Sequence, residues 1–249
     1  MLHALVTVAF VTGAALAAKD VRADLHSDMV VLDRAYVPAL ALTNQPKPEP
    51  AEKAIARLRA EWNRFRTAHA SAPPTFDAAA WAKHLREVEG AVAAAEANIA
   101  VRKGPAAHED LEHVREAQLA VRRGAGMPYL LDDLTVYHEA MEKLAGPATA
   151  KTAASLTEAD VAAIKAALPE AERSWRIVVE RRGQVARHGV AADVEQAIQS
   201  DIDAQTQLLA EVGAALSAGD RARIAEKAML TKPAFSKMFQ RFGDFAGLR

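Results

Sequence analysis

The chain has 249 residues, of which 51% are apolar and 25% charged, and its 31 Lys and Arg residues nearly balance its 32 Asp and Glu residues. This length and apolar content fit one large domain or two of about 120 residues and exclude a disordered chain. The balanced charge predicts no general attraction to nucleic acid or anionic membranes. The absence of cysteine excludes disulfides, thiolate chemistry, iron–sulfur clusters and covalent haem attachment through C-x-x-C-H.

The N-terminus has the pattern of a secretory signal. Residues 1–17 carry no Lys, Arg, Asp or Glu, contain an apolar run from Ala4 to about Leu16, and end in an A-x-A motif at Ala17. The usual positive charge before the run is replaced by His3 and the terminal amine, and an uncleaved anchor is the alternative. Because a spanning helix needs about 20 apolar residues, the pattern favours cleavage and export to the periplasm. No further membrane-spanning run follows in the mature chain from about Ala18.

Composition and spacing predict an all-α protein. Alanine dominates the apolar residues, and strand-like runs of Val, Ile and Thr are nearly absent. Apolar residues three and four apart predict helices in the first half over about 28–43, 51–69, 77–101 and 106–123, with Asp77 as an N-cap. In the second half they predict helices over about 129–144, from 155, and over 191–216, 219–230 and 233–242; Pro169 either starts or kinks the helix that reaches about 188. A capping box at the helix near 155 pairs either Ser155 with Glu158 or Thr157 with Asp160.

The same order of features occurs twice along the chain. Leu32 to Tyr36 with Leu40 corresponds to Leu134 to Tyr137 with Met141; Trp62 corresponds to Trp175; and Gly-led helix starts follow at Gly104 and Gly219. We therefore predict a duplicated antiparallel helical bundle of about eight helices after the signal. Its halves, 18–126 and 127–249, are either two domains or one fused bundle.

No motif that would identify an enzyme is present. The chain lacks G-x-S-x-G, a Gly-rich phosphate loop, H-E-x-x-H and a Rossmann fingerprint, and no serine sits beside a histidine in an elbow. The sequence therefore favours a non-enzymatic protein.

The polar residues around the midpoint of the chain are the best candidates for a binding site. Residues 106–123 carry His108, Asp110, Glu112 and His113, and the next predicted helix carries His138 and Glu142. A short loop predicts that these helices form an antiparallel hairpin. His138 and Glu142 stand at i, i+4, a spacing at which an imidazole and a carboxylate can bind the same metal ion.

We therefore predict a metal site for copper, iron or zinc from His108, His113, His138 and Glu142. Asp110 and His113 add the i, i+3 spacing used by di-metal bundles, although the full ligand set of those bundles is missing. The site would be confined to one copy, because Val37 and Arg223 stand where His138 and His108 stand. The alternative is that the histidines are hydrogen-bonded core residues and that the acidic residues form a solvated face.

Four other clusters have less favoured or purely structural interpretations. Met29, near His26, could with a core histidine clamp a non-covalent haem, the least favoured cofactor. The paired tyrosines and tryptophans are expected to be core anchors. The arginines around Trp62 and Trp175 are expected to make i, i+4 ion pairs on solvated faces. The C-terminal stripe of Phe235, Met238, Phe239 and Phe242 is expected to cap the core, with docking to a partner or membrane as the alternative.

Together these patterns predict an exported, soluble, non-enzymatic helical binding protein that handles a transition-metal ion or another small ligand in the cell envelope. The first alternative is a helical scaffold or interaction module that binds a protein partner and no ligand. The second is a redox protein with non-covalent haem. Neither nucleic acid nor a membrane span in the mature chain is expected.

Overall fold

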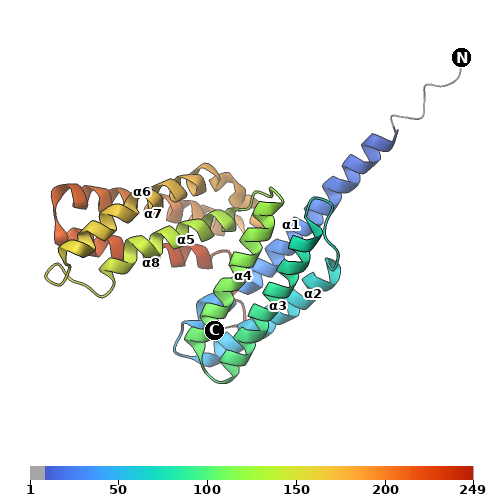
Figure 1. Ribbon diagram of the computed structural model, residues 1–249, viewed down its shortest axis with the longest axis horizontal. Coiled ribbons are helices and arrows are strands. Elements are labelled where there is room, and N and C mark those ends of the chain that lie inside the picture. Colours follow the sequence, from blue (N-terminus) through green and yellow to red (C-terminus); the bar gives the residue numbers. More distant parts are fainter. Residues whose placement is uncertain (1–8, 249) are drawn as a thin grey trace, which may run out of the picture. The chain divides into compact units, whose positions relative to one another are not determined.

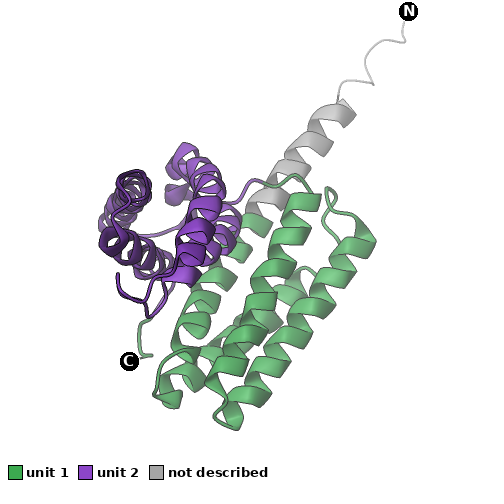
Figure 2. Ribbon diagram, turned by 60° about the vertical axis from the view of Figure 1, so that its left-hand side comes forward, with its two compact units in different colours: residues 1–127, 245–249 green, residues 128–244 purple. Residues whose placement is uncertain are grey.

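The computed structural model describes residues 9–248, and it describes side chains from residue 25 onward. Over this part of the chain the fold is all-α, with helices and no strand, as predicted. Residues 1–8, which hold the start of the predicted signal, lie outside the described residues. The chain divides into two compact units, residues 1–127 with 245–249 and residues 128–244 (Figure 2).

Unit 1 is a four-helix bundle. Its helices are α1 (Ala9–Thr43), α2 (Pro48–Ala68), α3 (Ala78–Ala100) and α4 (Gly104–Gly124) (Figure 1). α1 packs against α2 and α4, and α3 packs against the same two helices. The pairing is antiparallel, since Tyr36 and Leu40 of α1 contact Leu111 and His108 of α4, respectively. Each helix therefore buries its apolar face against two neighbours.

Unit 2 repeats this arrangement with four α-helices and two short 3₁₀ segments. In chain order these are α5 (Leu130–Ala145), η1 (Gly146–Ala148), α6 (Glu158–Glu180), η2 (Arg182–His188), α7 (Ala192–Ala218) and α8 (Arg221–Gln240). α5 packs against α6 and α8, and α7 packs against the same two helices. The order of helices and the set of neighbours are thus the same in both units.

Two helix boundaries differ from the prediction. Pro233 lies inside α8, where separate helices were predicted, and α1 begins at Ala9 instead of near Asp28. Pro169, expected either to start or to kink a helix, lies inside α6. A proline removes one helical hydrogen bond, but packing on both sides can compensate. Leu168 and Ala171 flank Pro169 and are buried, as are Thr231 and Phe235 around Pro233.

Helix starts follow the predicted capping chemistry. The Asp77 carboxylate accepts a hydrogen bond from the Ala80 amide at 2.8 Å, which confirms the predicted N-cap of α3. Of the two capping boxes considered for α6, the structure has Thr157 with Asp160, whereas Ser155 contacts Thr152 instead. Gly104 opens α4 where a Cβ would lie 2.5 Å from the Thr43 carbonyl oxygen, so the close approach of α1 to α4 requires glycine there.

The paired aromatic residues are core anchors, as expected. Tyr36, Trp62, Tyr137 and Trp175 are all at most 2% exposed. The Tyr36 hydroxyl donates to the Leu111 carbonyl at 3.0 Å, and the two indoles donate to the next helix, Trp62 to Glu89 at 2.8 Å and Trp175 to Thr206 at 2.9 Å. Both tryptophans therefore bind the third helix of their unit from the second.

The C-terminal aromatic stripe is also core. Phe235, Met238, Phe239 and Phe242 are buried, and Phe235 packs against Tyr137 at a ring-centroid distance of 5.8 Å. The stripe therefore closes the interior of unit 2, which confirms the core interpretation.

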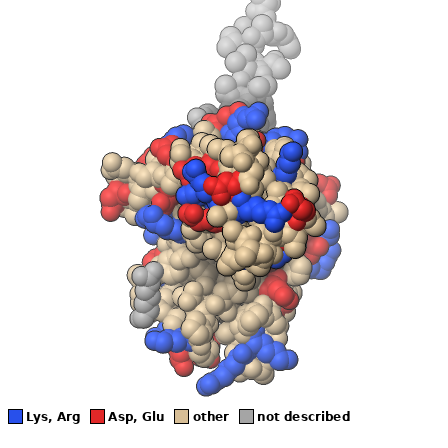
Figure 3. All heavy atoms as spheres, turned by 90° about the vertical axis from the view of Figure 1, so that its left-hand side faces the viewer, with Lys and Arg blue, Asp and Glu red and all other residues tan. Residues whose placement is uncertain are grey.

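The arginines follow the prediction only in part. Arg64 and Arg173 pair with Glu61 and Glu170 along their own helices, at i, i+3. Others bridge neighbouring helices: Arg59 of α2 binds Glu89 and Glu96 of α3, each at 2.8 Å. Arg182 likewise reaches Asp203 of α7 at 2.8 Å. On the face drawn in Figure 3, basic and acidic side chains are interspersed. None of the described helices combines the length and apolar character needed to cross a membrane.

Candidate functional site

The predicted ligands come from two units. α4, with His108 and His113, belongs to unit 1, and α5, with His138 and Glu142, belongs to unit 2. Each helix has packing partners within its own bundle: α4 packs against α1 and α3, and α5 against α6 and α8. Each group of residues is therefore described within its unit.

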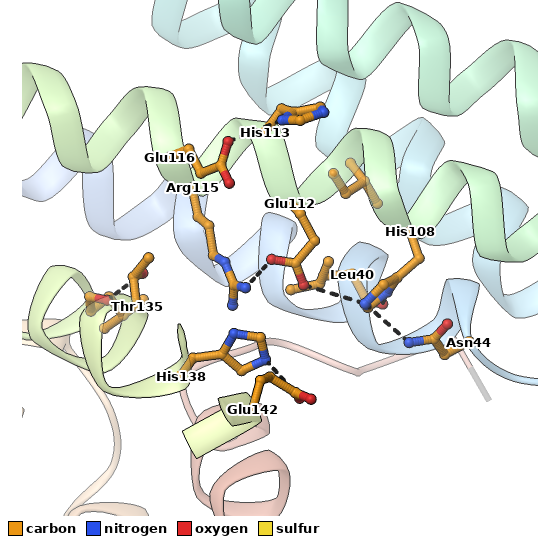
Figure 4. A network of polar contacts seen from close by, with 12 residues as sticks. Leu40, Asn44, His108, Glu112, His113, Arg115, Glu116, Thr135, His138 and Glu142 are labelled. Carbon is orange, nitrogen blue, oxygen red and sulfur yellow. Dashed lines mark hydrogen bonds and ion pairs between the residues drawn. The ribbon is translucent and has the colours of Figure 1, made fainter. Parts of the chain in front are cut away.

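His108 sits where α4 meets the C-terminal end of α1. Its Nδ1 lies 2.9 Å from the Leu40 carbonyl oxygen and 3.2 Å from the Thr43 hydroxyl. Its Nε2 lies 3.1 Å from the Asn44 amide nitrogen and 3.3 Å from a Glu112 carboxylate oxygen (Figure 4). In the tautomer that donates from Nδ1 to Leu40, the Nε2 lone pair accepts the hydrogen bond from the Asn44 amide, and it could coordinate a metal ion if that bond were given up.

Glu112 links His108 to Arg115. Its second carboxylate oxygen is paired with the Arg115 guanidinium, whose side chain is only 10% exposed. All three residues lie on α4, at i, i+4 and i, i+7 from His108, so they form one stripe along the helix. The carboxylate of this stripe therefore has an imidazole on one side and a nearly buried cation on the other.

Unit 2 holds a second histidine–glutamate pair with the same spacing. His138 Nε2 lies 3.4 Å from Glu142 Oε1, and Lys232 of α8 lies 2.9 Å from the same oxygen. The imidazole packs on Phe235 at a centroid distance of 5.4 Å. The hydrogen bond from His138, with a further contribution from Lys232, lowers the pKa of Glu142 to about 2. Glu142 is therefore an anion at every physiological pH.

His113 stands apart from both pairs. Its side chain is 70% exposed, and Nδ1 lies 3.0 Å from a Glu116 oxygen. That contact, the largest of several, raises the pKa of His113. Because five residues turn a helix by about 140°, His113 points away from the face that carries His108, as Figure 4 shows. It lies at the edge of an open groove of about 560 Å³ between α3 and α4.

No group of three or more His, Cys, Asp or Glu side chains that could hold a metal ion occurs among the described residues. Each histidine–glutamate pair therefore supplies two protein ligands by itself. Met29, considered for haem, is 1% exposed in the core of unit 1.

Sequence reasoning named Glu112 but left it out of the predicted ligands, and it did not point to Asn44 or Lys232. Glu112 was available, because it stands at the same i, i+4 spacing from His108 as Glu142 does from His138. Asn44 and Lys232 come from helix ends and neighbours distant along the chain, and no local pattern points to them.

The chain matches no protein-family model, no curated protein and no solved structure. The functional argument therefore depends on the geometry of these residues.

Proposed function

We propose that this chain is an exported, non-enzymatic binding protein for a divalent transition-metal ion, zinc or copper by ligand type, with one histidine–glutamate pair in each unit as the ligands. The pairs are His108 with Glu112 and His138 with Glu142. The observation that carries the proposal is the separation of the two ligand atoms, which is nearly the same in both pairs: 3.3 Å in the first and 3.4 Å in the second.

This separation suits a shared metal ion better than a strong hydrogen bond. Charge-assisted N–H···O bonds are about 2.7–2.9 Å long. Two ligands at about 2.0–2.2 Å from a tetrahedral zinc ion stand about 3.3–3.5 Å apart. An ion could therefore bind either pair with little movement of the histidine and the glutamate, once the Asn44 amide or the Lys232 ammonium group moves aside.

The surroundings of His108 support the same role. Metal-binding histidines usually donate the other ring N–H to a carbonyl or carboxylate, which fixes the ring and raises its basicity. His108 has such an acceptor in the Leu40 carbonyl oxygen at 2.9 Å. The ring is therefore oriented before any ion arrives, with Nε2 toward Glu112.

Calorimetric titration of the purified protein with Zn²⁺ and Cu²⁺ tests the proposal. We expect the His108→Gln, Glu112→Gln variant to bind metal at least tenfold more weakly in unit 1. The His138→Gln, Glu142→Gln variant should show the same loss in unit 2. His113→Gln is the matched control, because it removes an exposed histidine of α4 without touching either pair. Binding that survives the quadruple variant, or that is lost in His113→Gln, would overturn the assignment.

The two double variants also show whether the pairs bind independently. If each pair binds its own ion, the quadruple variant loses the sum of the two effects, since independent sites are additive. Each double variant should then lower the stoichiometry by one ion.

Export forms part of the proposal and has its own test. The apolar run and A-x-A motif at Ala17 support cleavage there. We expect protein recovered from the periplasm to begin at Ala18 by mass spectrometry. Recovery of the uncleaved chain in the membrane fraction would favour the anchor instead.

A further inference from the structure

Lys232 places a positive charge directly on the carboxylate of the unit 2 pair. Its Nζ lies 2.9 Å from Glu142 Oε1 and 3.0 Å from Oε2, so the ammonium group spans both oxygens. Oε1 is also the oxygen that faces His138 Nε2 at 3.4 Å. The ammonium group therefore contacts the same oxygen that a metal ion shared with His138 would need.

The corresponding cation in unit 1 is held differently. Arg115 pairs with Glu112 through the oxygen that does not face His108, and the Arg115 side chain is 10% exposed. The Lys232 side chain is 58% exposed and reaches Glu142 from a different helix, α8. Lys232 can therefore swing into solvent on its four-carbon stem, whereas Arg115 is enclosed by its bundle.

We infer that Lys232 is an internal competitor for the cation position of the His138–Glu142 pair, and that a divalent metal ion binds there by displacing the Lys232 ammonium group from Glu142. This inference rests on the proposed function, because it concerns the same pair. Displacement breaks two charge-assisted contacts and leaves a like charge near the bound ion. Lys232 would thus set the affinity of unit 2 without being a ligand.

The magnitude follows from ordinary surface electrostatics. An exposed ion pair is a weak interaction, and residual repulsion from the released lysine adds to its effect in the same direction. Removing the charge is therefore expected to tighten metal binding about three- to tenfold. The effect should shrink at high salt, since exposed charges are screened.

The chain offers a closely matched control in Lys237. It lies on the same helix, its side chain is 65% exposed, and it pairs with Asp201 at 2.8 Å. Asp201 keeps Arg241 as a second partner when Lys237 is changed, as Glu142 keeps His138. Lys232→Gln and Lys237→Gln therefore remove the same charge from the same element, but only the first touches the proposed site.

The test is Zn²⁺ titration of the full chain in the His108→Gln, Glu112→Gln background, where only the unit 2 pair remains. We expect Lys232→Gln to tighten binding three- to tenfold and Lys237→Gln to leave it within twofold of the background. Adding His138→Gln to Lys232→Gln should abolish the gain. Equal affinities in the two lysine variants would overturn the role of Lys232 but not the unit 2 site. Absence of Zn²⁺ binding in this background and in its Lys232→Gln variant would overturn the unit 2 site itself, and the inference with it.

Discussion

Trp62 donates its indole N–H to the Glu89 carboxylate at 2.8 Å, and this bond joins α2 to α3 inside unit 1. Glu89 also binds Arg59 of α2, so one carboxylate serves two donors from the same helix. The two contacts lower the pKa of Glu89 against the opposing effect of burial. In unit 2, Trp175 makes the corresponding contact with the neutral hydroxyl of Thr206.

This difference predicts unequal costs for the same substitution. Trp62→Phe removes a hydrogen bond to a charged group and should cost about 1.5–3 kcal/mol, whereas Trp175→Phe removes a neutral one and should cost about 0.5–1.5 kcal/mol, beyond any shared packing loss. Urea unfolding followed by circular dichroism measures both. Equal losses would show that packing outweighs the hydrogen bonds at these positions.

The buried His84 predicts that the stability of unit 1 depends on pH. It is 3% exposed, and burial, reinforced by the charge of Arg122, lowers its pKa from 6.5 to about 4. Between pH 4 and pH 6.5, His84 therefore carries a proton in the unfolded chain but not in the folded chain. Stability is therefore full above pH 6.5 and falls as the pH drops toward 4, by at most roughly 3 kcal/mol.

Urea titrations at pH 7.5, 6, 5 and 4.5 check this dependence against His84→Gln. The variant has no titratable group at this position, so its stability should fall less steeply over this range. Parallel curves for the two proteins would rule out His84 as the source.

Two glycines predict opposite results for the same change. Gly104→Ala brings a Cβ to 2.5 Å from the Thr43 carbonyl oxygen, whereas Gly90→Ala meets nothing within 4 Å on an exposed face of α3. The first should destabilise unit 1 by about 2 kcal/mol or more, since backbone must shift. The second should stabilise it by about 0.5–1 kcal/mol through helix propensity. Thermal unfolding of both variants measures the difference, and two changes of the same sign would contradict it.

Two substitutions at the start of α6 distinguish between its two candidate capping residues. Thr157→Ala removes the hydroxyl that accepts from the Asp160 amide at 3.2 Å and should cost about 1 kcal/mol. Ser155→Ala removes only a turn contact with Thr152 and should cost less than half of that. Chemical denaturation ranks the two, and a larger loss for Ser155→Ala would reverse the assignment.

Local signals predicted the fold well where they were unambiguous. Asp77 caps α3, and Gly and Pro mark the connections before α2 and α4, so these helices begin near their expected positions. Pro233 misled the prediction and Pro169 left it open, because buried neighbours hold a helix across each proline and such packing is not encoded in a local window.

The candidate site could likewise be predicted only in part from the sequence. His138 and Glu142 were found because both lie on one helix, four residues apart. Glu112 carried the same signal and was passed over in favour of His113, whose ring lies on another face of α4. The partners of these pairs, Asn44 and Lys232, lie 64 and 90 residues away in sequence, and only the folded chain reveals them.

The first and fourth helices of each unit are antiparallel neighbours, so a unit receives the chain and releases it at the same end of its bundle. Each bundle can therefore complete its packing from its own four helices before the chain passes through the short connection between Gly124 and Leu130.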